Sequence, residues 1–415
     1  MWKMKPENWH MNKLEELMAE LCPNGVPQKR LDENCNIFDN KRKPITKSAR
    51  EFGIYPYYGA NGIQDYVSDY IFDGTYILIG EDGSVITASG NPVVNWVTGK
   101  VWVNNHAHIL GEKEGVLLRY LFHYIQTIDI SSLVHGNIPK LTGGDLRAIQ
   151  IPVPPIPVQE EIVRILDSFT ELTAELTAEL TARKKQYEYY RDDLLKCNAT
   201  IPMVKLKDIA TDIYRGTGIK REEVTESGIP CVRYGEIYTT YNTWFDTCKS
   251  HTDLKYVPNP KYFEHGDILF AITGESVDDI AKSVAYVGHE KCLAGGDIVV
   301  MKHKQNPRYL AHVLATQAAR EQKSKGKVKS KVVHSNVPSI EQIEIPLPSL
   351  EVQERYANVL DNFESLCNDL KIGLPAEIEA RRKQYEYYRD LLLSFASDSS
   401  QFVNVERESR SRAER

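Results

Sequence analysis

A tyrosine-rich segment occurs twice in the chain, and this repetition constrains the fold more than any other feature of the sequence. Residues 183–195 read RKKQYEYYRDDLL, and residues 381–393 read RRKQYEYYRDLLL. A second pair of segments precedes them, because IQIPVPPIPVQE at 149–160 returns as IEIPLPSLEVQE at 343–354. Repetition at so long a period indicates that a whole structural module has been duplicated. We therefore expect two copies of one plan.

Each tyrosine-rich segment lies at the C-terminal end of a stretch whose apolar residues have the spacing of a long helix. In the first copy, leucines recur every four residues through the TAEL repeats: Leu172, Leu176 and Leu180. In the second copy, Gly373 and Pro375 interrupt the apolar face, and a proline inside a helix costs about 3 kcal/mol or more, so we expect a break near 371–375. Because one chain supplies both helices, we predict that they pair with each other, antiparallel. The alternative is an intermolecular coiled coil in a homodimer.

The TAEL repeats change the helix in fixed steps. Each unit would lengthen a helix by ~6 Å and rotate the residues after it by ~40° net. Such a repeat is suited to act as a ruler. The alternative is replication slippage tolerated in a helical linker.

Between the helical stretches the composition changes to Gly, Tyr, Thr, Val and Asn, with short β-type runs such as YILIG at 76–80 and DIVVMK at 297–302. Proline-rich hinges at 152–157 and 346–348 mark the boundaries. We predict an N-terminal helix within 1–25, a first domain at 26–155, a first spacer helix at 156–197, a second domain at 198–348, a second spacer helix at 349–395 and a disordered tail at 396–415.

Length and composition limit the class of protein. The 415 residues, 42% of them hydrophobic, suffice for about two domains. No apolar run approaches the ~18 residues of a membrane span, and the first ten residues hold no signal-peptide core, so we expect a soluble intracellular protein. The seven cysteines include no CxxC pair and favour free thiols over disulfides or zinc. The net charge of −6 does not exclude a local basic cleft.

Basic and aromatic side chains gather at matching places in the two domains and are candidates to bind DNA. Basic groups neutralise phosphates, and Asn or Arg can read base edges. The candidates in the first domain are Lys41, Arg42, Lys43, Lys47, Tyr57, Tyr58 and Asn61. Those in the second domain are Arg215, Lys220, Arg221, Arg233, Tyr234, Lys325, Lys327 and Lys329. The last three belong to a run of alternating lysines at 323–331, which would project to one side if extended; the alternative is solvated surface charge.

Signs of an enzyme are mostly missing. Asn91-Pro92-Val93 does not meet the Asn/Asp-Pro-Pro-aromatic motif of a methyltransferase that acts on DNA amino groups. GEDGS at 80–84 lacks the lysine and the spacing of a phosphate loop. His106 and His108 lie two residues apart without a third ligand, which favours ordinary strand histidines over a metal site. We expect no catalytic residue, metal or cofactor in this chain.

Two unlike domains, each followed by a near-identical helical block, resemble the DNA specificity subunit of type I restriction-modification enzymes. TAEL repeats ahead of RKKQYEYYRD look like one subfamily of it. The segments GIPCVRYGE at 228–236 and GDILFAITGE at 266–275 contribute to the resemblance, which covers nearly the whole chain apart from the tail.

The resemblance implies an α+β protein with two α/β target recognition domains, separated by two long helices paired as an antiparallel coiled coil, with a pseudo-twofold internal repeat. It also implies a non-catalytic cytoplasmic subunit that reads a split, asymmetric DNA site, one half with each domain. In this family the number of tetrapeptides is associated with the spacing of the half-sites.

The partners that the resemblance implies are two modification subunits, which bind S-adenosylmethionine and methylate adenine, and two restriction subunits, which use ATP and magnesium in host defence. By position, the residues for helix pairing or partner binding are Tyr187, Tyr190, Arg191, Tyr385, Tyr388 and Arg389, together with the three leucines above. A methyltransferase with a degenerate motif and a homodimeric coiled-coil adaptor remain as alternatives.

Overall fold

The computed structural model describes residues 8–196, 200–325, 332–368 and 373–395. The chain divides into two compact units, one made of Met1–Glu175 with Glu379–Arg415, the other of Leu176–Ile378. Each unit therefore combines the domain of one copy with the tyrosine-rich segment of the other copy. The predicted disordered tail at 396–415 lies outside the described residues.

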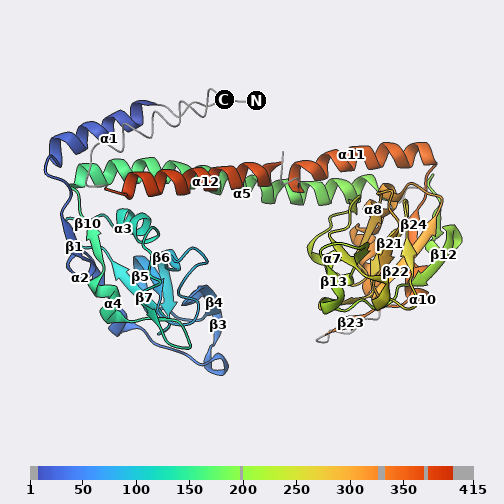
Figure 1. Cartoon of the computed structure of the whole chain (residues 1–415), viewed down its shortest axis with the longest axis horizontal. Coiled ribbons are helices and arrows are strands. Elements are labelled where there is room, and N and C mark those ends of the chain that lie inside the picture. The colour runs from blue at the N-terminus through green and yellow to red at the C-terminus, as the bar shows by residue number, and fades with distance from the viewer. Residues whose placement is uncertain (1–7, 197–199, 326–331, 369–372, 396–415) are drawn as a thin grey trace. The chain divides into compact units, whose positions relative to one another are not determined.

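Four helices account for the helical stretches of the sequence (Figure 1): α1 (Asn8–Leu21), α5 (Ile156–Leu194), α11 (Leu350–Asn368) and α12 (Leu374–Leu393). α5 is continuous over 39 residues, as expected from its many Ala, Glu and Leu residues, which are strong helix formers. At the predicted break, α11 ends at Asn368 and α12 begins at Leu374 with Pro375 in its first turn, where a proline is tolerated. Residues 369–372 lie outside the described part.

Within each unit a segment of α5 runs antiparallel to a helix of the other copy (Figure 1). In the first unit, Phe169 of α5 stacks on Tyr388 of α12, with ring centroids 5.2 Å apart. In the second unit, Tyr190 of α5 lies against Phe363 of α11, at 6.1 Å. Among the described residues, no helix combines the length and apolarity needed to cross a membrane.

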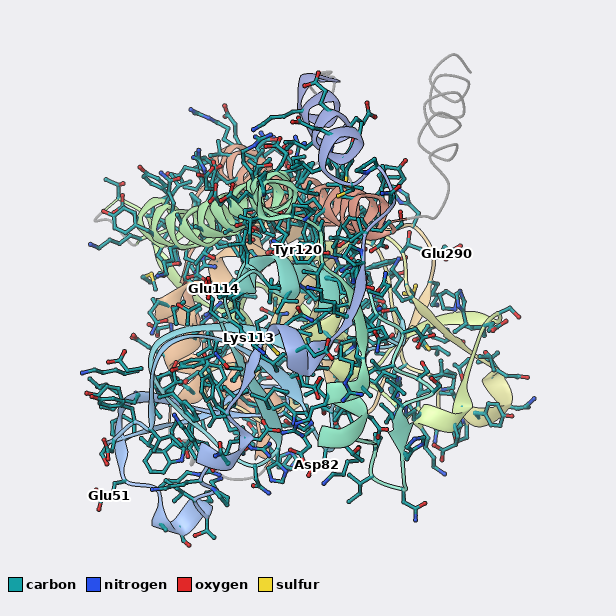
Figure 2. The ribbon with its side chains drawn as sticks, turned by 90° about the vertical axis from the view of Figure 1, so that its left-hand side faces the viewer. Glu51, Asp82, Lys113, Glu114, Tyr120 and Glu290 are labelled. Atoms are coloured by element: carbon teal, nitrogen blue, oxygen red, sulfur yellow. The ribbon has the colours of Figure 1, made fainter. Side chains whose placement is uncertain are left out.

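The first domain is built on one six-stranded sheet, in which only β3 and β6 are parallel neighbours. In spatial order its strands are β2 (Asn36–Ile37), β7 (Ala107–Gly111), β5 (Phe72–Gly80), β6 (Val94–Val103), β3 (Phe52–Gly59) and β4 (Gly62–Val67). Smaller elements are α2 (Leu31–Asn34), α3 (Leu118–Ile125), α4 (Gly143–Ala148), two 3-10 turns (Asp39–Lys41 and Lys47–Ala49) and the pair β8 (Val134–His135) and β9 (Lys140–Leu141). Tyr120 on α3 lies next to the helices of its unit, whereas Glu51 and Asp82 lie at the opposite end of the domain (Figure 2).

The second domain has two five-stranded sheets. One contains β12 (Ala210–Arg215), β22 (Ile298–His303), β18 (Ile268–Ala271), β20 (Ser283–Tyr286) and β15 (Trp244–Phe245). The other contains β13 (Val224–Thr225), β16 (Ser250–Thr252), β14 (Ile229–Val232), β21 (Cys292–Ala294) and β17 (Tyr262–Phe263). The remaining elements are α6 (Leu206–Ile209), α7 (Tyr234–Thr239), α8 (Pro307–Leu314), α9 (Gln317–Ser324), α10 (Val337–Glu341), two 3-10 turns (Arg221–Glu223 and Leu254–Tyr256) and the pair β19 (Thr273–Gly274) and β23 (Val333–His334).

The two domains close in the same way where they meet their helices. A three-residue antiparallel pair joins the start and end of each domain, β1 (Gln28–Arg30) with β10 (Gln150–Pro152) and β11 (Met203–Lys205) with β24 (Glu344–Pro346). The carbonyls of the proline hinges accept bonds from buried tyrosine hydroxyls, Tyr120 to Pro152 at 2.8 Å and Tyr309 to Pro346 at 2.7 Å. These bonds satisfy buried carbonyls at the point where each chain segment enters a long helix.

The core of each unit continues from the domain into the helices. In the first unit, Ile162 and Leu166 of α5 and Leu392 of α12 share one apolar cluster with Leu121 of α3. The corresponding cluster of the second unit joins residues of α5 and α11 to α8: Tyr187, Ala357, Leu360, Leu310 and Leu314. Full burial of one such aliphatic side chain contributes roughly 1.5–3 kcal/mol, so each domain is held firmly on its helices.

Candidate nucleic-acid interface

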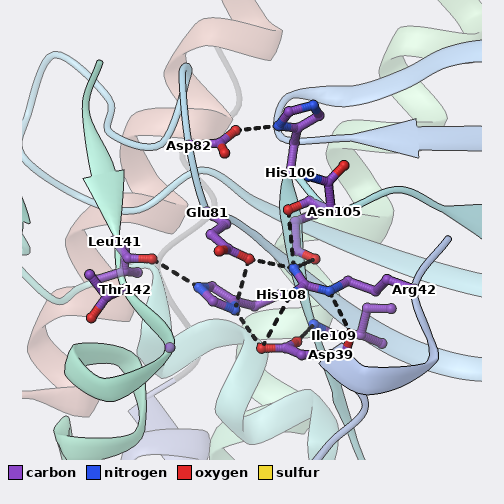
Figure 3. Close-up of polar contacts among 12 residues, drawn as sticks. Asp39, Arg42, Glu81, Asp82, Asn105, His106, His108, Ile109, Leu141 and Thr142 are labelled. Carbon is purple, nitrogen blue, oxygen red and sulfur yellow. Dashed lines mark hydrogen bonds and ion pairs between the residues drawn. The ribbon is translucent and has the colours of Figure 1, made fainter. Parts of the chain in front are cut away.

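In the first domain, the basic segment 39–50 is held against the sheet by a network of polar contacts (Figure 3). Asp39 accepts from the backbone N–H of Ile109 and lies 2.7 Å from Nδ1 of His108. Burial disfavours the charge of Asp39, but the hydrogen bonds from His108 and Ile109 and the positive charges nearby together outweigh burial and lower the pKa of this carboxyl. Arg42 donates to Glu81 and to the carbonyl of Ala107. The network fixes the backbone from which the predicted DNA-binding side chains extend.

The seven predicted residues of this domain differ in how far they are exposed. Arg42 and Tyr57 are engaged inside it: the Arg42 side chain is 13% exposed, and Tyr57 is 1% exposed and bonded through its hydroxyl to the backbone of Ile45. Tyr58 is half-buried. The exposed members are Lys41, Lys43, Lys47 and Asn61. The lysines can reach an anionic surface, whereas Arg42 and Tyr57 support the loop that carries them.

In the second domain, five of the eight predicted residues lie at or next to one hollow of about 440 Å³. Arg221, Arg233 and Tyr234 line it directly. Arg215 donates to Gly296 and pairs at 2.6 Å with Asp297, and both of these residues also line the hollow. Lys220 is adjacent in sequence and exposed. The region that the sequence identified by its composition is therefore a shaped, partly basic surface.

The lysine run near the end of this domain differs from expectation. Lys323 is not part of an extended strand, because α9 continues through Ser324, and its side chain is buried. Its Nζ donates to the carbonyl of Leu314 at 2.8 Å and to Ser283 at 3.1 Å, and burial lowers its pKa to about 7. The expectation that the whole run projects to one side is wrong for this first lysine. Lys325 is exposed, and Lys327 and Lys329 lie outside the described residues.

The tyrosine-rich segment makes the same contact in both units. In the first unit, the Tyr385 hydroxyl lies 2.9 Å from Nδ1 of His123 on α3, and Nε2 of His123 lies 2.8 Å from Asp167 on α5. Because an ionised carboxylate only accepts, Nε2 donates to Asp167 and Nδ1 accepts from the tyrosine. Burial lowers the pKa of His123. A neutral histidine thus joins three segments of one unit.

The second unit repeats this chain of bonds with its own residues. The Tyr187 hydroxyl lies 3.0 Å from Nδ1 of His312 on α8, and Nε2 of His312 lies 2.8 Å from Asp361 on α11. An arginine of the domain also pairs with each aspartate, Arg119 with Asp167 at 2.8 Å and Arg308 with Asp361 at 2.6 Å. Each tyrosine-rich segment therefore binds the domain of the copy to which it does not belong.

The other residues predicted for helix pairing or partner binding lie beside these contacts. The Arg191 and Arg389 guanidinium groups lie over the rings of Tyr187 and Tyr385, at 5.6 and 5.7 Å from the ring centroids. Tyr190 and Tyr388 contact the facing helix, as described above. The TAEL leucines Leu172, Leu176 and Leu180 are half-buried, and Leu180 packs against the core of the second unit. Tyr189 and Tyr387 of the same segments are exposed.

One group of potential metal ligands occurs among the described residues, formed by His312, Asp361 and Glu364, whose ligand atoms lie within 4.8 Å of one another. All three already have protein partners. Asp361 accepts from Arg308, Trp244 and His312, and Glu364 accepts from the backbone and hydroxyl of Thr243. The group is explained by these bonds as part of the contact between domain and helices.

The sequence interpretation missed the histidines and aspartates of the repeated contact. Asp167 and Asp361 each stand two residues before a phenylalanine, in DSF and DNF, at the 194-residue spacing of the proline hinges. His123 lies on α3 and His312 lies on α8. Alignment of the two copies would have revealed the aspartates. The histidines are separated by a different spacing, 189 residues, and the sequence carried no comparable signal for them.

Comparison with known proteins places this arrangement in a family. A model of the type I restriction modification DNA specificity domain matches residues 23–183 and 199–380. A putative type I restriction enzyme specificity subunit of Haemophilus influenzae is 35% identical over 383 residues, which cover 89% of this chain and 96% of that protein. The EcoR124I/EcoR124II specificity subunit of Escherichia coli is 33% identical over 67% of this chain and 71% of its own length.

A solved structure from work on complex assembly and conformational transition of the type I R-M system shares the fold. Its TM-score is 0.53 at 15% sequence identity, and the match covers 90% of this chain and 97% of that chain.

Proposed function

The chain belongs to the type I restriction-modification DNA specificity family, and we propose from this premise that its two domains read the two halves of a split, asymmetric DNA site. Exposed lysines of both domains would neutralise phosphates, and the residues around the hollow in the second domain would contact base edges. The two domains differ in sheet order and side chains, so each would read a different sequence.

We further propose that the helices dock two modification subunits, and through them the restriction subunits. The observation that carries this proposal is the repeated tyrosine, histidine and aspartate contact, which holds two unlike domains against near-identical helical segments. Similar surfaces would then be offered to two identical partners. S-adenosylmethionine, ATP and magnesium belong to those partners, whose active sites would reach adenine by flipping it out of the duplex. The chain itself would be non-catalytic and would act in the cytoplasm.

Two measurements on the isolated chain separate this proposal from its rivals. Tight stoichiometric binding of S-adenosylmethionine would instead support a degenerate methyltransferase. A mass from light scattering that stays dimeric on dilution would support a homodimeric adaptor. The repeated contact supports a monomer, because each tyrosine finds its histidine within the same chain. We expect a monomeric chain without S-adenosylmethionine that takes up two modification subunits on titration.

A further inference from the structure

Arg233 lines the hollow of the second domain and is held in place by its backbone. It follows strand β14 and precedes helix α7, and its backbone N–H donates to Glu236 at 2.7 Å. The other carboxylate oxygen of Glu236 accepts from Ser250. Nε of Arg233 is buried and has no hydrogen-bond partner among the described residues. A buried donor left unpaired is destabilising, so this side chain is suited to a ligand that supplies an acceptor.

The surface around Arg233 is open enough to admit such a ligand. The hollow of about 440 Å³ is lined by several glycines, and a side chain added at Gly218 or Gly235 would meet no atom within 4 Å. Gly296 approaches the backbone so closely that an added Cβ would lie 2.8 Å from Cα of Gly218. The hollow thus combines open space over two glycines with a tight contact of two backbone segments.

The charges around the hollow distinguish between the two acceptors that DNA offers to an arginine. The planar guanidinium binds two acceptors side by side, as presented by a phosphate or by N7 and O6 of guanine. Two carboxylates, Asp297 and Glu236, also line the hollow. Glu236 accepts from the backbone N–H of Arg233, so it opposes an anionic phosphate at this residue and is compatible with a neutral base edge; Asp297 is already paired with Arg215. Tyr234, 39% exposed, adds an aromatic surface to the lining.

We propose that Arg233 is a specificity-determining residue that reads a guanine in the half-site bound by the second domain. This inference rests on the proposed function, since it requires that this domain contacts DNA.

The test uses the full chain in complex with its modification subunits and a duplex library with both half-sites randomised. Selection with the wild type should yield one invariant guanine in the second half-site. Arg233→Gln should lower the preference for that guanine by about 5- to 150-fold and leave the other positions unchanged. Arg233→Lys keeps the positive charge but lacks the two parallel N–H donors of the guanidinium, so it should also lower the preference for guanine at that position.

Arg221→Gln provides the matched control from the same hollow, because Arg221 is exposed. It should weaken binding to all sequences alike, as expected for a phosphate contact. Replacing the selected guanine with 7-deazaguanine, which lacks the N7 acceptor, should weaken wild-type binding and should not weaken Arg233→Gln any further.

Three results would overturn the assignment to Arg233: a wild-type motif without guanine in the second half-site, an unchanged preference in Arg233→Gln, or a loss in Arg233→Gln that is equal on every sequence. A wild-type complex that selects no split motif would instead defeat the proposed function.

Discussion

Removing the hydroxyl of Tyr187 or Tyr385 should weaken the unit to which that tyrosine is bonded. Tyr→Phe at either position leaves Nδ1 of a fully buried histidine without a donor, because these hydroxyls lie 3.0 Å from His312 and 2.9 Å from His123. An acceptor left unpaired in this way costs about 1–3 kcal/mol. Since the two contacts share no residue, the free energy of unfolding lost in the double variant should be about the sum of the losses in the two single variants.

Hydrogen exchange on the isolated chain measures each contact separately. Tyr187→Phe should lower the protection of backbone amides in α8, and Tyr385→Phe should lower it in α3. The same segments supply matched controls, since Tyr189 and Tyr387 are 67% and 53% exposed and their Phe variants should stay within about 0.5 kcal/mol of the wild type. If Tyr187→Phe behaves like Tyr189→Phe and only weakens binding of a modification subunit, the tyrosine serves partner docking and the reasoning is refuted.

Two further predictions concern the spacer helix and the buried lysine. Deleting Thr177–Leu180 removes ~6 Å of α5, so the gap between the half-sites should shorten by at most about two base pairs while both half-sites are kept. An unchanged gap in the methylated motif would show that the repeats do not set the spacing. The pKa of Lys323 is lowered to about 7 in the folded chain, whereas an ordinary lysine has a pKa of 10.5. Between these two pH values the unfolded chain binds one more proton than the folded chain. The free energy of unfolding should therefore rise with pH in this range, by up to about 1.4 kcal/mol per pH unit. Lys323→Met should flatten this part of the stability curve in urea unfolding, whereas Lys325→Met, at an exposed position, should leave it unchanged.

The internal repeat made the long helices predictable, because helical spacing and proline hinges are local signals. The proline hinges predicted where α5 and α11 begin, and Pro375 lies in the first turn of α12. Residues 307–324 form two helices, α8 and α9, because Thr316 caps a new helix by accepting from the backbone of Ala319. A cap within an apolar helical stretch gives a weak signal against the surrounding periodicity.

The candidate site was less accessible to sequence reasoning. Composition indicated where basic residues gather along the chain. It did not distinguish Lys43, which is exposed, from Arg42, whose guanidinium donates to Glu81 inside the domain. That distinction depends on Asp39, Glu81 and His108, which come together only through long-range strand pairing. Lys323 was misread for the same reason, since its partner Leu314 lies on another helix.

The most direct test of the account is genome-wide detection of methylated adenine in cells that carry this chain with its modification subunits. We predict a split, asymmetric motif that is methylated when the chain is present and lost when it is deleted. Exchanging residues 198–348 for the second domain of a relative should change one half of that motif and preserve the other half. The absence of any split motif that depends on this chain would contradict the account.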